Sequence, residues 1–144
     1  MPSSEIKILG VRECLALLRS VPVGRVVFTE GALPAIRPVN FAVIDGVVVI
    51  RGARGSWADK LHNTVVAFEA DEIDIATHTG WNVVVIGKAQ LVTDIDEMVE
   101  LIQPMSRPWA TGHRDRLLKV EMEQISGRRL VPAHAAVLHQ VTPS

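Results

Sequence analysis

The chain has 144 residues and carries 15 Lys and Arg against 16 Asp and Glu, a formal net charge of −1 at pH 7. This length allows one domain with one core and leaves little room for two. A composition that is 48% hydrophobic and 22% charged is typical of a packed globular protein, not of a disordered one. The near-neutral charge argues against an electrostatic nucleic-acid binder, which would carry a basic face.

The cysteine count and the lengths of the apolar segments indicate the cellular compartment to expect. Cys14 is the only cysteine, so no disulfide can form within the chain, and its helical context favours a small core residue over a nucleophile. No apolar segment approaches the roughly 20 residues that a membrane helix needs. The first residues lack the layout of a signal peptide. We therefore expect a cytoplasmic protein that binds neither membrane nor nucleic acid.

Short valine-rich runs dominate the first half of the chain. Valine occurs 21 times in all, and β-branched residues favour strands. Pro38 cannot donate to a ladder, so its strand should lie at an edge, a bulge or a mouth there. Asp45-Gly46 is a strong signal for a tight hairpin. The elements expected here are a helix over 11–20 and strands over 24–30, 34–44 and 47–51.

The second half begins with a glycine-rich turn. Ser56 precedes Asp59 at capping-box spacing, which predicts a helix of one to two turns. Asp94 caps a second helix, and a proline-rich loop follows it over 104–109. The other elements expected are strands over 64–74, 81–93 and 117–125. About six strands without βαβ alternation predict a mainly β fold, a small closed or half-closed antiparallel barrel with peripheral helices.

Cationic side chains surround the short helix that follows residue 52. Arg51, Arg54 and Lys60 lie close in sequence to the Ser56 hydroxyl and to the free N–H groups of a helix start. Such a set can hold a phosphate. An ordinary glycine-rich turn with solvated charges fits the same pattern. The segment matches neither a Walker loop nor a dinucleotide GxGxxG motif.

Polar and aromatic residues mark two of the predicted strands. Arg37 and Asn40 interrupt an apolar strand, where burial without a partner would be costly. Alternation places Asn40 opposite Val39, so Asn40 should be exposed unless a ligand or a second subunit covers that face. Trp81 opens the long strand as a wall for a planar ligand or, more often for an aromatic residue, as a packing residue. The acidic run 69–72 is expected to be solvated.

Metal binding is not expected, because the five histidines show no tight pair spacing. No Gly-x-Ser-x-Gly elbow is present. The residues alone therefore assign no catalytic side chain and leave the phosphate-type segment as the most informative one.

Five segments, taken in their order and spacing, resemble the pyridoxamine 5′-phosphate oxidase-like family of FMN-binding split barrels. The resemblance runs from about residue 9 to 130 and leaves the tail over 131–144 without an assigned structure. The segments that carry it are Val23–Phe28, Leu33–Phe41, Gly55–Lys60, Val66–Asp71 and Gly80–Ala89.

The resemblance implies a six-stranded antiparallel split barrel that works as a homodimer with two interface sites for FMN. It also implies a small-molecule substrate. The side chains that it places at the flavin fall into three groups. They are Arg37, Pro38, Val39 and Asn40 along the isoalloxazine ring, Arg51, Ser56 and Lys60 around the phosphate, and Trp81 and Asn82 approaching from the partner subunit.

Two positions depart from the family pattern. Gly52 stands where Thr or Ser is common, and Asn82 stands where Ser is frequent. The C-terminal segment that closes on pyridoxal phosphate in the true oxidase has no convincing match here, so vitamin B6 oxidation is not expected. We expect an FMN-dependent oxidoreductase acting on an unidentified small molecule. The alternatives are a deazaflavin-binding reductase of the same fold and a non-enzymatic dimeric flavin-binding module.

Overall fold

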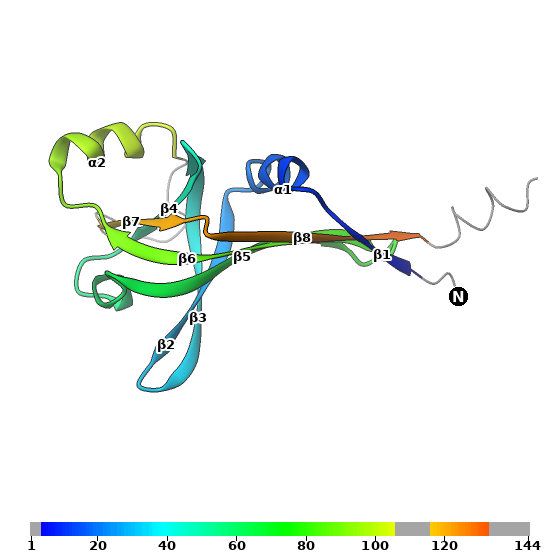
Figure 1. Cartoon of the computed structure of the whole chain (residues 1–144), viewed down its shortest axis with the longest axis horizontal. Helices are drawn as coiled ribbons and strands as arrows, with labels where there is room; N and C mark the ends of the chain where they lie inside the picture. The colour runs from blue at the N-terminus through cyan, green and yellow to red at the C-terminus, as the bar shows by residue number, and fades with distance from the viewer. Residues whose placement is uncertain (1–3, 106–115, 133–144) are drawn as a thin grey trace, which may run out of the picture.

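The computed structural model describes residues 4–105 and 116–132, which form eight antiparallel strands, two α-helices and one 3-10 helix (Figure 1). In chain order the elements are β1 (Ser4–Ile8), α1 (Val11–Leu18), β2 (Val23–Glu30), β3 (Leu33–Ile44), β4 (Val47–Gly52), η1 (Trp57–Lys60), β5 (Thr64–Asp74), β6 (Thr79–Leu91), α2 (Ile95–Ile102), β7 (Arg116–Glu121) and β8 (Gln124–Pro132).

Six of the strands close into a barrel. The pairing runs β6–β5–β2–β3–β4–β7 and returns to β6, while β8 and β1 extend the sheet from β6. One edge of β6 pairs with two strands: residues 80–86 pair with β8, and residues 89–91 pair with β7. Gly87 lies between these two stretches, where a Cβ atom would collide with the carbonyl oxygen of Glu121. The expected antiparallel barrel with peripheral helices is confirmed.

The prediction of a single strand over 117–125 is wrong. The chain breaks at Met122 and Glu123 into β7 and β8, which pair with different partners: β7 joins β4, and β8 joins β6. No glycine or proline marks this break, because it is set by tertiary pairing. β1 was also not expected. All five of its residues are exposed, and its backbone pairing with β8 defines it as a strand.

The other expected elements are present with bounds close to those predicted. Asp45 and Gly46 have φ values of 50° and 77°, as a type I′ hairpin turn requires. Asp94 caps α2 by accepting a hydrogen bond from the Asp96 N–H. Cys14 in α1 is buried, which confirms its assignment as a core residue.

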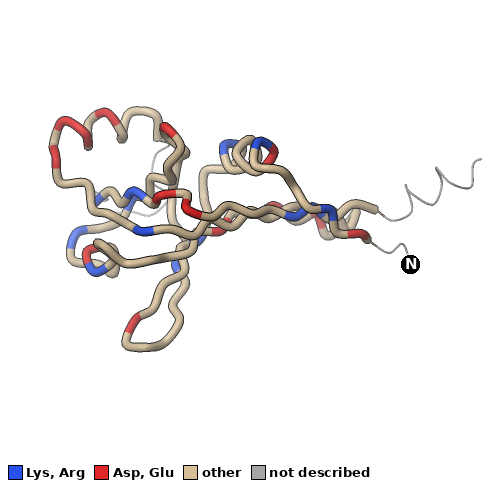
Figure 2. Tube along the Cα trace, in the orientation of Figure 1, with Lys and Arg blue, Asp and Glu red and all other residues tan. Residues whose placement is uncertain are grey.

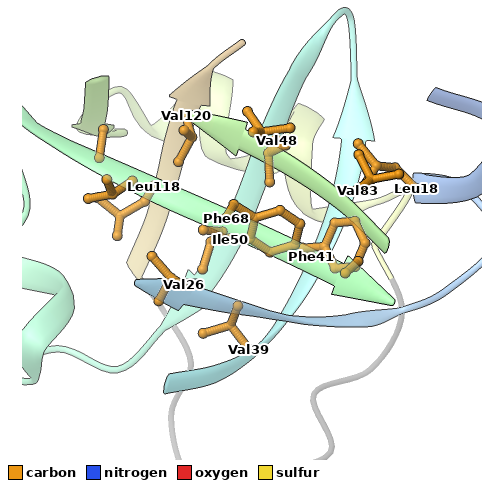
Figure 3. Packing of buried hydrophobic residues seen from close by; sticks show 14 of the residues in the cluster. Leu18, Val26, Val39, Phe41, Val48, Ile50, Phe68, Val83, Leu118 and Val120 are labelled. Carbon is orange, nitrogen blue, oxygen red and sulfur yellow. The ribbon is translucent and has the colours of Figure 1, made fainter. Parts of the chain in front are cut away.

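The barrel interior is filled by alternate residues of the strands (Figure 3). Phe41 and Phe68 meet near its centre with ring centroids 4.6 Å apart. A second, smaller cluster packs α2 against the outer side of β4 and β7 and includes Val49, Leu101 and Leu117. Burying both clusters against water is the main force that holds the strands in a closed ring.

Within residues 4–105 and 116–132, no helix is long and apolar enough to cross a membrane. Most of the proline-rich loop expected over 104–109, and the tail over 133–144, lie outside the described residues.

Candidate functional site

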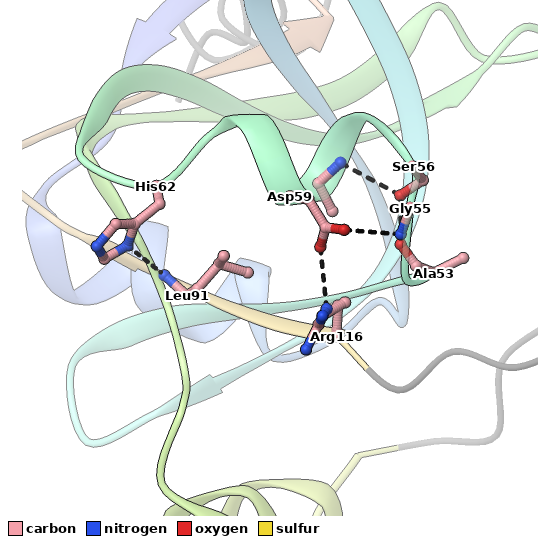
Figure 4. A network of polar contacts seen from close by, with 8 residues as sticks. Ala53, Gly55, Ser56, Asp59, His62, Leu91 and Arg116 are labelled. Carbon is pink, nitrogen blue, oxygen red and sulfur yellow. Dashed lines mark hydrogen bonds and ion pairs between the residues drawn. The ribbon is translucent and has the colours of Figure 1, made fainter.

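Side chains within the turn between β4 and η1 form hydrogen bonds to its backbone (Figure 4). The Ser56 hydroxyl accepts a hydrogen bond from the Ala58 N–H at 3.2 Å and donates one to the Ala53 carbonyl at 2.5 Å. The Asp59 carboxylate accepts from the Gly55 N–H at 2.7 Å. The predicted cap at Ser56 is therefore confirmed, with the difference that Asp59 bonds to Gly55 and not to Ser56 itself.

Asp59 also joins η1 to β7. Its second oxygen accepts from Nε of Arg116 at 2.9 Å, and both side chains are about one-third exposed. Arg116 thus brings a further cation to the turn. Sequence reasoning missed it, because 57 residues separate Arg116 from Asp59 and no local pattern links them.

The residues predicted to hold a phosphate lie together around this turn. Arg51 ends β4 half-buried, and desolvation lowers the pKa of its guanidinium. Ser56 is half-buried, whereas Lys60 is exposed at the end of η1. A Cβ atom on Gly52 would lie 2.8 Å from that of Ala58, so the turn packs too closely for a Thr or Ser at that position.

An aromatic column connects this turn with β3. The guanidinium of Arg37 lies 5.7 Å from the ring centre of Phe28, within the range of a cation–π contact. The Phe28 ring in turn stacks on Trp57 of η1 at 5.5 Å. Arg37 and the phosphate-type turn therefore belong to one region of the chain, and the connecting residue Phe28 was not identified from the sequence.

The other residues predicted on β3 have different surroundings. Pro38 is exposed, and the Val39 side chain packs in the barrel interior. Asn40 is only 9% exposed in the single chain, so the expectation that it faces solvent is wrong. Next to it, the Phe41 N–H donates to the carbonyl of Pro22, in the segment that leads into β2, at 3.1 Å.

Trp81 and Asn82 lie in a different region, at a pocket of about 320 Å³. β1, β5, β6 and β8 contribute its walls, which combine apolar, amide and charged side chains. Trp81 is largely buried and Asn82 is half-buried. The lining residues are Ile6, Glu69, Asp71, Ile73, Gly80, Trp81, Asn82, Arg128, Arg129 and Leu130.

Two carboxylates of this pocket share one guanidinium nitrogen. Nη1 of Arg25 lies 3.3 Å from Oε1 of Glu69 and 3.1 Å from Oδ2 of Asp71. Their side chains are 24% and 27% exposed, so the expectation that this acidic run is fully solvated is wrong for these two. Desolvation, helped by the neighbouring Asp71, raises the pKa of Glu69 to about 7, although Arg25 opposes the shift.

Two groups of predicted site residues lie at opposite ends of β6: the phosphate-type residues near η1 and the pair Trp81 and Asn82. Trp81 is near its start, while the turn after η1 contacts its end: the Asn63 N–H donates to the Ala89 carbonyl, and the Leu91 N–H donates to Nδ1 of His62. At about 3.3 Å per strand residue, ~26 Å of strand separates Trp81 from Ala89. Lys and Arg positions occur both near η1 and where β8 pairs with β1 (Figure 2). One chain does not bring the two groups together.

Among the residues that the structure describes, no group of three or more His, Cys, Asp or Glu side chains could hold a metal ion.

Comparison with known proteins identifies the family. Residues 10–129 match the family model described as pyridoxamine 5′-phosphate oxidase. The chain belongs to this family. An uncharacterised protein of Mycobacterium tuberculosis is 44% identical over 135 residues, which cover 88% of this chain and 87% of that protein. The family resemblance expected from the sequence is thereby confirmed, over nearly the range expected.

Solved structures share the barrel. The FAD binding protein from Mycobacterium smegmatis is 33% identical with a TM-score of 0.68, and the match covers 87% of this chain and 98% of that one. A conserved protein of unknown function from Corynebacterium diphtheriae is 30% identical with a TM-score of 0.74, over 88% of this chain and 98% of that one. This chain and both of these structures share the split-barrel fold.

Proposed function

We propose that this protein binds a flavin at the interface of a homodimer and acts as an oxidoreductase on a small molecule. Its family and its 33% identity to an FAD binding protein support a flavin ligand. The observation that carries the proposal is the separation of the two site groups along β6. A flavin that contacts both groups needs one group from each of two chains.

The exposed apolar face supports a second copy of the chain. Ile6 and Ile8 on β1 are 62% and 71% exposed, and Ile73 on β5 is also exposed beside the same pocket. Contiguous apolar surface of this kind marks an interaction site in a soluble protein. Docking a second copy there would bury these side chains, and the proposal requires that the turn at η1 of that copy face the pocket at Asn82.

The donor set around η1 fits a flavin phosphate. A guanidinium at Arg51, a hydroxyl at Ser56 and an ammonium at Lys60 are the groups that bind phosphate in proteins. The guanidinium of Arg116 adds a fourth donor group beside them. We assign phosphate binding to Arg51, Ser56 and Lys60, as the family resemblance implies.

The ring would lie between the second group and the β3 strand of the other chain. The amides of Asn82 and Asn40 and the guanidinium of Arg37 are suited to hydrogen-bond its carbonyls and nitrogens. Trp81, which packs mainly in the barrel interior, would contribute to the floor of the pocket. Val39 and Pro38 have no polar side-chain atom and would contribute through backbone or packing contacts. A bound flavin supplies the hydride and single-electron chemistry, and the protein orients it and excludes water.

FMN is the ligand that we propose, because its ring and single phosphate match the two groups. FAD contains the same ring and phosphate and adds an adenosine monophosphate, and a deazaflavin coenzyme has a closely similar ring. The full-length chain is therefore titrated with FMN, FAD and the deazaflavin in parallel. We expect tight binding of FMN and an absorbance band near roughly 450 nm, the usual flavin band. No binding of any of the three would contradict the proposal.

The phosphate assignment has its own test. Replacing Arg51 and Lys60 together by Ala should weaken FMN binding at least tenfold, because each charge-assisted bond contributes about 1.5–3 kcal/mol. The matched control is Lys88→Ala, which removes an exposed cation from β6. Equal losses in both variants, or no loss in the double variant, would remove the assignment. Oxidation of a reduced nicotinamide by the FMN-loaded protein separates an enzyme from a flavin-binding module.

A further inference from the structure

Glu69 and Asp71 form a paired acidic group on the outer face of the sheet. They are two residues apart on β5, so their side chains point to the same side. Both reach Nη1 of Arg25 on β2, at 3.3 and 3.1 Å. Because one guanidinium nitrogen bridges two half-buried carboxylates, the pair carries more negative charge than this contact balances, and a proton on the pair relieves the repulsion.

The pair lies in the pocket that holds the second group of site residues. Asp71 is the direct cross-strand partner of Asn82, so both side chains lie on the same face, whereas Glu72 and its partner Trp81 point to the opposite face. Ile73 and Leu130 make the adjacent wall apolar. A planar ligand lying against Asn82 would therefore cover the two carboxylates.

The charged groups around the Glu69–Asp71 pair influence the pH at which the pair binds a proton. Among the described residues, β2 contributes Arg25, and β8 contributes Arg128 and Arg129 to the same pocket, while β1 and β6 contribute uncharged side chains. Desolvation and the charge of Asp71 outweigh Arg25 and raise the pKa of Glu69 to about 7. The proton occupancy of the pair thus changes near neutral pH.

We propose that the Glu69–Asp71 pair is part of the flavin site and that flavin binds there together with one proton taken up from solvent. This inference rests on the proposed function, and it adds two residues and a pH dependence to it. The proton bonds to a carboxylate oxygen of the pair. A ring that covers the pair removes water from the charged form, so the ligand favours the protonated form and the affinity falls as the pH rises.

The test is the dissociation constant for FMN and for riboflavin, measured with the full chain between pH 6 and pH 8.5. We expect the affinity of wild type to fall by up to tenfold per pH unit above the midpoint, the limit for one proton. Calorimetry in two buffers of different ionisation enthalpy should show proton uptake. Riboflavin has no phosphate, whose own ionisation near pH 6 complicates the FMN titration.

Three variants assign the proton. Glu69→Gln should bind with an affinity that no longer falls with pH and should exceed wild type about tenfold or more at pH 8.5. Asp71→Asn should shift the midpoint to lower pH, because it removes the charge that disfavours ionised Glu69. Glu72→Gln, an exposed carboxylate on the same strand, is the matched control and should keep the wild-type profile.

An unchanged pH profile in Glu69→Gln, or binding to wild type without proton uptake, would overturn the inference and leave flavin binding intact. Wild type that binds neither FMN, FAD, deazaflavin nor riboflavin at any pH would overturn the proposed function itself, and this inference with it.

Discussion

The rings of Phe28 and Trp57 stack with centroids 5.5 Å apart and planes inclined by 21°. Phe28 belongs to β2 and Trp57 to η1, so the stack fastens the β2–β3 hairpin to the turn that follows β4. The guanidinium of Arg37 on β3 lies 5.7 Å from the centre of the Phe28 ring. The strand that carries Arg37 and the turn that carries Ser56 are therefore held at a fixed separation, as a shared ligand site requires.

Replacing Trp57 by Ala should lower the free energy of unfolding by about 2 kcal/mol, because it removes the stack and part of the packing around Phe28. Trp57→Phe keeps an aromatic ring and should retain most of the stability. Urea unfolding of the two variants measures the difference. Equal losses in both would show that ring stacking is not what stabilises this contact.

Gly87→Ala should destabilise the barrel by at least ~2 kcal/mol, because the added methyl group would collide with the carbonyl oxygen of Glu121 where β6 passes from β8 to β7. Gly10 has open space around its Cα and a φ of −78°, so Gly10→Ala is the control and should be nearly neutral. Thermal melting compares the two variants. A well-tolerated Gly87→Ala would contradict the close approach at this junction.

Asp59→Asn should lower the free energy of unfolding by about 1 kcal/mol, because it weakens the contacts with Arg116 and with the Gly55 N–H. A double-mutant cycle with Arg116→Gln isolates the ion pair from the backbone contact. Additive effects of the two substitutions would mean that Asp59 and Arg116 do not stabilise each other.

The pH dependence of stability should report Glu69 directly. Its pKa is raised from 4.5 to about 7 on folding, so the native state binds the proton more tightly than the unfolded state. The stability contribution is fully present below pH 4.5 and is lost as the pH rises to about 7. In the ligand-free protein, Glu69→Gln should therefore be more stable than wild type by about 1 kcal/mol at pH 8, after allowance for solvent screening.

The same advantage should vanish at about pH 3.5, roughly one unit below the unfolded-state pKa, where wild-type Glu69 is mostly protonated in both states. Denaturant titrations at the two pH values measure it, with Glu72→Gln as the control. A Glu69→Gln variant that is less stable than wild type at pH 8 would show that the contact with Arg25 outweighs the burial of the carboxylate.

Local chemistry was enough to predict most elements of the barrel. Alternating valine runs, the Asp45-Gly46 hairpin and the Ser56 and Asp94 caps each act within a few residues of chain. The break between β7 and β8 was missed, because nothing in the composition of 121–124 ends a strand. The break arises because the segment before it pairs with β4, whereas the segment after it pairs with β6.

The site was harder to predict for the same reason. Arg116 reaches Asp59 across 57 residues, and Arg25 reaches Asp71 across 46, so neither pair leaves a local pattern. Strand alternation placed Asn40 on the exposed face, yet it is only 9% exposed in the single chain. From the sequence, Phe28 could not be distinguished from other core aromatic residues, because its stack on Trp57 of η1 forms only in the folded structure.

The central claim is that two chains together hold flavin. Native mass spectrometry of the purified full-length protein after incubation with FMN tests it most directly, because it reports subunit number and ligand number at once. We expect a dimer that carries two FMN molecules. A monomer, or a dimer that carries no flavin after incubation with FMN, FAD or the deazaflavin, would contradict it.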